Sequence, residues 1–522
     1  MLTIDVDYGN TLMSRKLLKT TFTVGGMTTI SRVFGLIRDV VIARLFGAGA
    51  GVDVFIVAFR IPNFLRRLFA EGGFSQAFIP VLAEYKEQRD GDSVKALIDQ
   101  TSATLGLILF AVTLIGVFAA PLLIMIFAPG FEDAKHVIAT DMLRITFPYI
   151  LFISLTAFAA SILNTYKQFA IPAFTPVLLN LSLISCAICL APKMAVPITA
   201  LAWGVLIAGV AQLLFQFPFL MKLKLFPRPG LNRDKEGVYR ILKLMLPTLF
   251  AVSIVQINLL VDTIFASNLV DGSISWLYFS DRMVEFPLGV FGIALATVLL
   301  PNLSSEHAKN ETDKFSSMMD WALRWVFIIA VPAAIGLAVL AIPVLATLFQ
   351  YGEFTSYATI MSGKSLLAYS AGLPAFILIK VFATGFFSRQ DTKTPVKIGA
   401  FAMFANIGLN FLLVDLFAHV GLALATSLSA SLQAFLLFWL LRKQGVYRPE
   451  SGWFKFAIQI TVAVSTMALL IHYCIAMPEQ WFAWNMLQRI GQLSFWIFAG
   501  GISYFTMLWI TGIRWQKMTA QH

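Results

Sequence analysis

Long apolar runs, separated by short polar segments, follow one another along nearly the whole 522-residue chain. Each run is long enough to cross a bilayer as an α-helix, and none shows the ten-residue alternation of a membrane β-strand. The pattern predicts an all-α polytopic membrane protein with fourteen transmembrane helices. The predicted spans cover residues 18–46, 52–83, 99–128, 139–163, 170–191, 197–221, 240–268, 273–303, 316–350, 357–387, 395–415, 420–441, 455–477 and 486–513.

Composition agrees with this pattern, because 58% of the residues are hydrophobic and only 13% are charged. A soluble domain carries about 25% charged residues. The first twenty residues are polar and mixed in charge, so we expect a cytoplasmic lead-in and not a cleaved signal peptide. The net charge of +11 would suit a nucleic-acid partner, but the basic residues are spread over short loops. We therefore expect no nucleic acid to bind.

The loop charges also predict the orientation in the membrane. With the N-terminus in the cytoplasm, most of the 39 Lys and Arg residues fall in cytoplasmic segments, and the outer segments hold only Lys135 and Lys193. Positive charge accumulates on the cytoplasmic side of multi-pass proteins. The bias therefore predicts a multi-pass membrane protein with both termini in the cytoplasm.

The chain also repeats itself at a shift of 221 to 223 positions. AFIPVLAEYK at 77–86 corresponds to VLLPNLSSEH at 298–307, and Pro172 corresponds to Pro395. The repeat predicts two pseudo-symmetric lobes of six helices in the same orientation, an arrangement typical of alternating-access transporters. The predicted domains are an N-terminal lobe at 1–221, a basic cytoplasmic linker at 222–239, a C-terminal lobe at 240–443, and two further helices with a cytoplasmic tail at 444–522.

Arginine residues within the predicted spans are the main candidates for chemistry. Arg32 and Arg38 lie in SRVFGLIRD, Arg66 follows a Pro62 kink together with Asn63, and Arg282 lies in DRMVEFP. Each Arg at the centre of a membrane helix costs roughly 2.5–3.5 kcal/mol, so we expect them to line a wet cavity and bind a ligand. The guanidinium fork matches phosphate best, which indicates an anionic cargo.

Structural alternatives exist for these charges. Arg32 and Arg38 can snorkel to a helix end, Arg67 can pair with Glu71, and Asp281, Arg282 and Glu285 can form a closed network without ligand. Lys380 either extends the basic cavity or snorkels to the inner surface.

A second candidate site uses oxygen ligands on three later spans. Asp262 lies in one span, Asn406 and Asn410 lie one helical turn apart in another, and Thr426 lies in the next. These residues are a candidate sodium or proton site, with interhelical hydrogen bonding as the alternative. The three cysteines, Cys186, Cys189 and Cys474, lie in apolar runs and form no complete metal-ligand pattern.

Several long motifs resemble one known family. SRVFGLIRD, VDVFIVAFRIPNFLRRLFAEGGFSQAFIPVLAEY, ITFPYILFISL, DRMVEFPLGV and GFFSRQDTKTPVKI are similar to the MurJ (MviN) lipid II flippases. That family belongs to the multidrug/oligosaccharidyl-lipid/polysaccharide exporter superfamily. The resemblance implies fourteen helices and a role in peptidoglycan synthesis and cell shape. It implies as cargo the undecaprenyl-diphosphate-linked disaccharide-pentapeptide, called lipid II.

The resemblance also implies residue roles. The arginines of the family's central cavity correspond to Arg32, Arg38, Arg66 and Arg282, and the accompanying polar positions correspond to Asp53, Asn63 and Glu285. We expect alternating access to carry the diphosphate from the cytoplasmic to the periplasmic leaflet, with the polyprenyl tail in lipid or in a groove of the last two helices. We expect no cofactor, coupling to membrane potential, Na⁺ or H⁺, contacts with membrane lipids, and partners among other cell-wall synthesis proteins.

Two other function classes compete with this hypothesis. A cation-coupled multidrug exporter, or an exporter of another polyprenyl-linked oligosaccharide, has the same predicted architecture. A polyprenyl-phosphate glycosyltransferase would need an acidic metal-binding cluster and a nucleotide-binding domain, and the cytoplasmic loops are too short for one. We therefore predict a transporter and not an enzyme.

Overall fold

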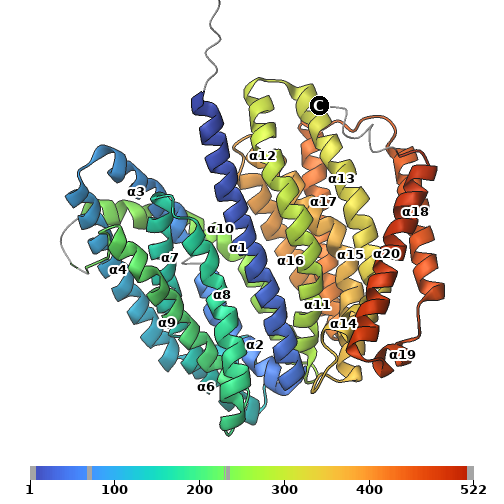
Figure 1. Cartoon of the computed structure of the whole chain (residues 1–522), viewed down its shortest axis with the longest axis horizontal. Helices are drawn as coiled ribbons and strands as arrows, with labels where there is room; N and C mark the ends of the chain where they lie inside the picture. Colours follow the sequence, from blue (N-terminus) through green and yellow to red (C-terminus); the bar gives the residue numbers. More distant parts are fainter. Residues whose placement is uncertain (1–7, 68–72, 229, 231–234, 514–522) are drawn as a thin grey trace, which may run out of the picture. The chain divides into compact units, whose positions relative to one another are not determined.

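The computed structural model describes residues 8–67, 73–228, 230 and 235–513, without the side chains of residues 8–24, 235, 246–256 and 293. The described part is built from α-helices with short connections and contains no strand (Figure 1). The all-α architecture predicted from the apolar runs is confirmed. The helices are α1 (Tyr8–Phe46), α2 (Ala50–Arg66), α3 (Ser75–Gln88), α4 (Gly91–Phe118), α5 (Ala120–Phe127), α6 (Asp133–Thr146), α7 (Tyr149–Thr165), α8 (Ala170–Ser185), α9 (Thr199–Lys222), α10 (Lys235–Ser267), α11 (Ser273–Pro287), α12 (Ile293–Ala308), α13 (Thr312–Val339), α14 (Ala341–Leu348), α15 (Ser356–Phe387), α16 (Lys393–Phe417), α17 (His419–Lys443), α18 (Trp453–Cys474), α19 (Pro478–Ala483) and α20 (Met486–Ile510).

Eleven helical segments of the described chain are long and apolar enough to cross a membrane. They coincide with eleven of the fourteen predicted spans. The other three predicted spans fall on α1, on α2 together with α3, and on α10, and each of these includes residues that are not described or are described without their side chains. The observed helices therefore fit the predicted count.

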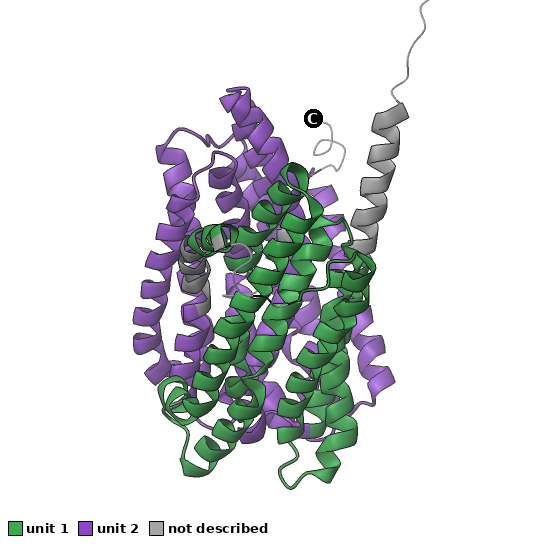
Figure 2. Ribbon diagram, turned by 90° about the vertical axis from the view of Figure 1, so that its left-hand side faces the viewer, with its two compact units in different colours: residues 1–45, 54–256 green, residues 46–53, 257–522 purple. Residues whose placement is uncertain are grey.

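Two compact units divide the chain (Figure 2). Unit 1 comprises residues 1–45 and 54–256, and unit 2 comprises residues 46–53 and 257–522. The short segment Phe46–Asp53, which connects α1 to α2, thus belongs to unit 2. The predicted domain bounds at 221, 239 and 443 stay a prediction.

The helix bounds preserve the internal repeat. A shift of 221 positions relates α4 and α5 to α13 and α14, so that the ends of α4 at Gly91 and Phe118 correspond to those of α13 at Thr312 and Val339. Both long spans break at the same place, where a proline lies near the start of the following short helix. Proline lacks a backbone donor, so it is tolerated in the first turn of the new helix and ends the preceding one.

A buried aspartate occupies equivalent positions in the two repeats. Asp99 of α4 accepts a hydrogen bond from the backbone N–H of Arg228 at 2.8 Å and pairs with Lys95. Asp320 of α13, 221 positions later, accepts one from the backbone N–H of Glu450 at 3.2 Å. Both carboxylates are fully buried, and each holds the segment that follows a long helix, α9 for Asp99 and α17 for Asp320. Neither aspartate was among the predicted site residues.

Asp320 also accepts bonds that attach the start of α18, and the segment before it, to α13. Tyr447 Oη donates at 2.8 Å, Trp453 Nε1 at 2.6 Å and Arg324 Nε at 2.7 Å. Burial of the Tyr447 phenol and its bond to the Asp320 carboxylate raise the pKa of Tyr447, so the hydroxyl remains a donor at neutral pH.

An apolar cluster completes the attachment of the two last long helices. It joins α18 and α20 to α13 and α14. Its buried members include Ile328, Ile460, Met467, Tyr504 and Leu508.

Candidate substrate-binding residues

Arg38 is held in a buried hydrogen-bond network within unit 1. It is 9% exposed, and its Nε and Nη2 donate to Asp39 Oδ1 at 2.9 and 2.7 Å. Its Nη1 donates to Asn180 Oδ1 of α8 at 3.0 Å, and Asn180 Nδ2 donates to the Ser31 carbonyl at 3.1 Å. Arg38 is therefore oriented by a carboxylate on its own helix and an amide on a neighbouring helix.

Arg32 lies on the same helix as Arg38 but in a more exposed environment. Its side chain is exposed, six residues before the buried Arg38. Six residues correspond to about 9 Å along an α-helix, so the two guanidinium groups lie at different depths along α1. Snorkelling therefore remains an alternative for Arg32, whereas the Arg38 guanidinium points into the protein.

Arg66 is positioned at a break in the second helix. Pro62 lies inside α2, and Arg66 is its last residue before a π-helical turn. Arg66 Nε donates to Asn63 Oδ1 at 2.9 Å, so the predicted proximity of these two side chains is confirmed. Glu71, the alternative partner considered for Arg67, lies outside the described residues.

Arg282 is half-buried on α11 in unit 2. Its Nη1 donates to Glu285 Oε2 at 2.6 Å, and its Nη2 donates to Tyr278 Oη at 3.3 Å. The guanidinium carbon lies 5.0 Å from the centroid of the Tyr278 ring, within the range of a cation–π contact. The side chains of Arg282 and Glu285 are 36% and 46% exposed, so this ion pair is accessible to a competing anion.

The structure gives Asp53 a capping role in unit 2. Its carboxylate is buried and accepts bonds from the backbone N–H groups of Gly272 at 2.6 Å and Ser275 at 2.8 Å, and from Ser275 Oγ at 2.5 Å. A carboxylate at a helix N-terminus is stabilised by the free N–H groups and the helix dipole. Gly272 has a φ of +96°, which a residue with a side chain rarely adopts. This contact fixes the start of the helix that carries Arg282.

Lys380 lies on α15 and its side chain is exposed. Its backbone carbonyl accepts a bond from Thr384 Oγ1 at 2.8 Å, which is an ordinary helical contact. The side chain therefore has room either to reach an anion or to snorkel, as the sequence indicated.

The predicted cation ligands come together in unit 2. Asn410 Nδ2 of α16 donates to Asp262 Oδ1 of α10 at 2.8 Å. The Asn406 amide orientation that satisfies both of its polar ends donates to Asn258 Oδ1 at 2.9 Å and to Asp262 Oδ1 at 3.3 Å. In that orientation Asn406 Oδ1 accepts from the Thr426 backbone N–H at 3.2 Å. The predicted convergence of these helices on one polar cluster is therefore seen in the structure.

One buried atom of this cluster suits a monovalent cation. Asn410 is fully buried, and within the described part of the chain its Oδ1 has no hydrogen-bond partner. An unpaired buried carbonyl oxygen costs about 1–3 kcal/mol, which a bound cation would recover. The described residues contain no group of three or more His, Cys, Asp or Glu that could hold a metal, so a divalent site with several charged ligands has no support there.

Sequence reasoning missed three residues of these networks. Asn180 orients Arg38, Tyr278 stacks on Arg282, and Asn258 joins the polar cluster. Each is a polar or amphipathic residue within an apolar run, which was a usable signal for Asn180 and Asn258. Tyr278 gave no signal, because aromatic residues are common in every span.

Comparison with known proteins assigns the chain to a family. The model of the lipid II flippase MurJ family matches residues 42–491. The chain belongs to this family. A relative from Vibrio cholerae serotype O1, described as a probable lipid II flippase MurJ, is 48% identical over 97% of this chain and 98% of its own length.

Solved structures agree with the assignment. A lipid II flippase MurJ in an inward closed conformation matches with a TM-score of 0.80 and 27% identity, over 93% of this chain and 98% of its own. A multidrug resistance MATE family transporter in an inward-facing conformation matches with a TM-score of 0.67 and 15% identity, over 81% and 98%. The second likeness shows a shared fold alone. The chain is therefore a multi-pass membrane transporter and not an enzyme.

Proposed function

We propose that this protein flips lipid II, the polyprenyl-diphosphate-linked peptidoglycan precursor, from the cytoplasmic to the periplasmic leaflet of the inner membrane. The observation that carries the proposal is the family match over most of the chain. Drug export, the main alternative, is supported only by a likeness of fold.

In this proposal Arg32, Arg38, Arg66 and Arg282 bind the diphosphate. Three of them already donate to a neighbouring oxygen acceptor: Asp39 for Arg38, Asn63 for Arg66 and Glu285 for Arg282. Such contacts hold the guanidinium groups in defined orientations, so less side-chain freedom is lost when the phosphate oxygens arrive. Arginine binds phosphate through two parallel charge-assisted bonds, each stronger than a neutral hydrogen bond. Lys380 adds positive charge from α15.

Acidic neighbours make the binding reversible in this account. A transporter must release its cargo, and Glu285 offers Arg282 an alternative acceptor at 2.6 Å when the diphosphate leaves. Asp39 does the same for Arg38. We propose that each carboxylate replaces the diphosphate on its arginine when the cargo leaves, and that this replacement accompanies alternating access of the two lobes.

The polar cluster around Asp262 is the proposed site of ion coupling. Its oxygen donors, with the unpaired Asn410 Oδ1, suit Na⁺, and Asp262 can alternatively carry a proton. Binding of a cation there would stabilise one conformation of unit 2 and so reset the cycle, with the membrane potential as a further driving force.

Orientation and partners follow from the charge distribution and the family. We propose that both termini are cytoplasmic, because nearly all loop Lys and Arg residues fall on that side. Lipid II is the cargo, and contacts with other cell-wall synthesis proteins stay a prediction.

The proposal is tested in proteoliposomes that contain lipid II with a fluorescent label in one leaflet. Wild-type protein is expected to expose the label to a quencher on the other side, and Arg66→Ala and Arg282→Ala are expected to abolish that exposure while inserting normally. Arg144→Ala is the matched control, because this exposed arginine pairs only with the neighbouring Asp141 in the described contacts. Full activity in both Arg66→Ala and Arg282→Ala would overturn the assignment of these arginines.

A further inference from the structure

Basic residues gather on unit 2 where two connections between helices meet. One connection joins α15 to α16 and carries Arg389, and the other begins at Gln444, directly after α17. Arg389 Nη1 donates to Gln444 Oε1 at 2.8 Å, so the two connections are in contact. Five cations at this place, which we call the basic patch, are exposed or partly exposed: Arg389, Lys393, Lys397, Arg442 and Lys443.

The basic patch has little negative charge beside it. Within the described residues none of its five cations belongs to an ion pair. The acid nearest in sequence is Asp391, whose oxygens accept from the Thr394 backbone N–H at 3.0 Å and from Thr394 Oγ1 at 2.6 Å. These bonds, and to a smaller extent the charge of Arg389, lower the pKa of the Asp391 carboxyl. One ionised acid therefore stands beside five cations, and an external anion can neutralise the excess.

The connection between α12 and α13, on the same predicted side of the membrane, is different. Lys309 pairs with Glu306 at 2.8 Å, and Lys314 pairs with Glu311 at 3.5 Å. Lysines that contribute to orientation in the membrane are thus compatible with local pairing. The basic patch lacks such pairs.

The internal repeat shows that the fold does not require the patch. Lys167 and Gln390, 223 positions apart, have φ values of +62° and +60°, so the turns after α7 and after α15 have the same geometry. At shifts of 223 and 221 positions, unit 1 carries uncharged residues in place of four of the five cations. These residues are Tyr166, Ala170, Phe174 and Met221. Most of the charge of the patch is therefore specific to unit 2.

Aromatic side chains indicate the depth of the patch in the membrane. The guanidinium carbon of Arg442 lies 5.8 Å from the centroid of the Phe438 ring, and Lys443 Nζ lies 4.9 Å from that of Trp439. Trp439 is 47% exposed. Exposed tryptophans near the ends of transmembrane helices lie at the depth of the lipid headgroups. The cations beside Trp439 are therefore at the depth of lipid phosphates.

One face of α16 leads from the basic patch to an apolar surface. The helix runs without a break from Lys393 to Phe417 (Figure 1). Lys393, Lys397, Phe401 and Phe404 are all exposed, and at 3.6 residues per turn they lie within about 80° of each other around the helix. Phe404 lies about 10 Å beyond Lys397 along the axis, less than the thickness of about 15 Å of one hydrocarbon leaflet. Cations and apolar side chains are thus aligned as the two parts of a lipid are.

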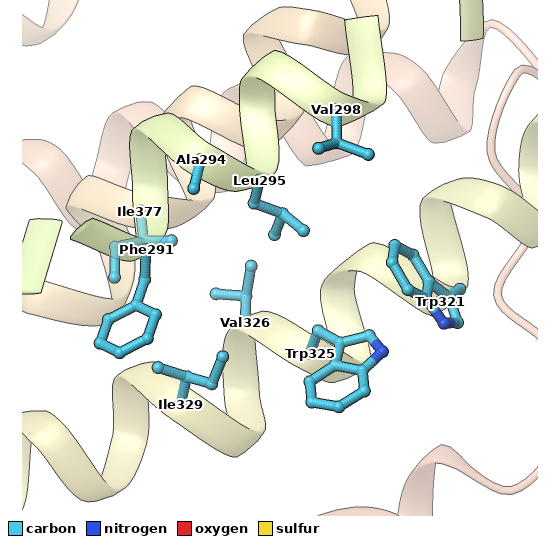
Figure 3. Close-up of a pocket in the computed structure, with 9 residues that line it drawn as sticks. All are labelled: Phe291, Ala294, Leu295, Val298, Trp321, Trp325, Val326, Ile329 and Ile377. Atoms are coloured by element: carbon cyan, nitrogen blue, oxygen red, sulfur yellow. The ribbon is translucent and has the colours of Figure 1, made fainter. Parts of the chain in front are cut away.

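The apolar cavity between α12 and α13 offers no such combination (Figure 3). The lining residues drawn there include no charged side chain, so the cavity has no group that would recognise a phosphate. Contact with both a headgroup and a hydrocarbon chain is therefore a property of the basic patch and α16.

We propose that the basic patch and the exposed face of α16 bind an anionic phospholipid. Its phosphate contacts the cations, and an acyl chain lies along Phe401 and Phe404. Each Lys or Arg near the membrane surface favours anionic lipids, and an arginine can form two parallel charge-assisted bonds to a phosphate. A bound headgroup would connect the start of α16 with the end of α17. The proposal goes beyond flipping and does not depend on lipid II as cargo.

The test is binding of phosphatidylglycerol to the purified full-length protein in an uncharged detergent, with phosphatidylcholine of the same acyl chains as reference. Two double variants remove charge from the patch at exposed positions: Lys393→Gln with Lys397→Gln, and Arg442→Gln with Lys443→Gln. The matched control is Lys309→Gln with Lys314→Gln, which removes the same charge from two exposed, acid-paired lysines of unit 2. Glycerol 3-phosphate is the probe without acyl chains.

We expect the wild type and the control to bind phosphatidylglycerol at least about tenfold more tightly than phosphatidylcholine. Each patch variant is expected to bring that ratio close to one. An unchanged ratio in both patch variants would overturn the proposal. An equal loss in the control would also overturn it, because net charge and not the patch would then decide binding. Displacement of phosphatidylglycerol by an equal concentration of glycerol 3-phosphate would show a phosphate site without a lipid and would contradict the proposal.

Arg282→Ala separates this site from the proposed cargo site. Arg282 lies on α11, outside the basic patch, so this variant is expected to keep the ratio of the wild type even if it no longer flips lipid II. A loss of the ratio in Arg282→Ala as large as in the patch variants would place the phospholipid at the Arg282 network and overturn the proposal.

Discussion

Replacing Glu285 by Gln is expected to tighten the binding of a diphosphate, in contrast to every substitution of the arginines. Glu285 Oε2 accepts from Arg282 Nη1 at 2.6 Å, and the two side chains are 46% and 36% exposed. A diphosphate that binds Arg282 must compete with this carboxylate and is also repelled by it. Glutamine keeps the shape and an acceptor oxygen but removes the negative charge.

The size of the effect follows from the exposure of the pair. Partly exposed ion pairs contribute about 0.2–1 kcal/mol, so losing the competitor is expected to tighten binding up to about fivefold. Removing the arginine loses one or more charge-assisted hydrogen bonds worth about 1.5–3 kcal/mol each, so Arg282→Ala is expected to weaken binding about tenfold or more. Both effects should shrink at high ionic strength, because salt screens exposed charges.

The assay is equilibrium binding of undecaprenyl diphosphate to the purified protein at low and high salt. Glu306→Gln is the matched control, because Glu306 forms a similar pair with Lys309 at 2.8 Å at the far end of α12. It is expected to leave binding unchanged. If Glu285→Gln weakens binding as strongly as Arg282→Ala, the carboxylate positions the arginine or touches the cargo, and the competition argument is wrong.

Three further predictions concern other parts of the molecule. Asp320→Ala leaves four hydrogen-bond donors around a buried site without their acceptor, so it is expected to destabilise the protein by about 3 kcal/mol. The loss is measured as a lower thermal midpoint in detergent. Asp313→Ala, at an exposed position of the same helix, should leave that midpoint unchanged. Asp262→Asn removes the charge of the polar cluster and is expected to abolish any dependence of flipping on Na⁺ or pH, and a dependence that survives would exclude this cluster as the coupling site. Asp391 lies in a loop outside the spans, and hydrogen bonds from Thr394 hold the pKa of its carboxyl below the usual value of 3.8. These bonds therefore stabilise the first turn of α16 above that pH. The stabilisation is lost as pH falls through the lower pKa of the folded state. The protection factor of the amides in that turn, which corrects for the intrinsic pH dependence of exchange, should therefore decrease under acid conditions in the wild type, and a protection factor that does not change with pH would contradict the argument.

Much of the architecture could be predicted because bilayer thickness and loop charge restrict a membrane protein strongly. Apolar runs located the spans, and matched prolines revealed the repeat. Helix breaks inside spans, such as the one between α4 and α5, were missed because a short non-helical step leaves no gap in an apolar run.

The candidate site was predicted less completely, for a physical reason. The sequence marked Arg38, Arg66 and Arg282 because charge in a membrane helix is costly, but it could not show their partners. Asn180 meets Arg38 from a helix 142 positions away, and Asp53 caps a helix 219 positions away. Asp53 shows the consequence, because the family resemblance implied a place for it beside the arginines, whereas its carboxylate accepts hydrogen bonds at the start of α11.

Translocation of lipid II in living cells tests the central claim most directly. Cells depleted of this protein are complemented with the wild type or with Arg282→Ala at equal expression, and the fraction of lipid II in the outer leaflet is measured. The account predicts that this fraction falls on depletion, returns with the wild type and does not return with the variant. A fraction that stays unchanged after depletion would contradict the flippase function of this protein.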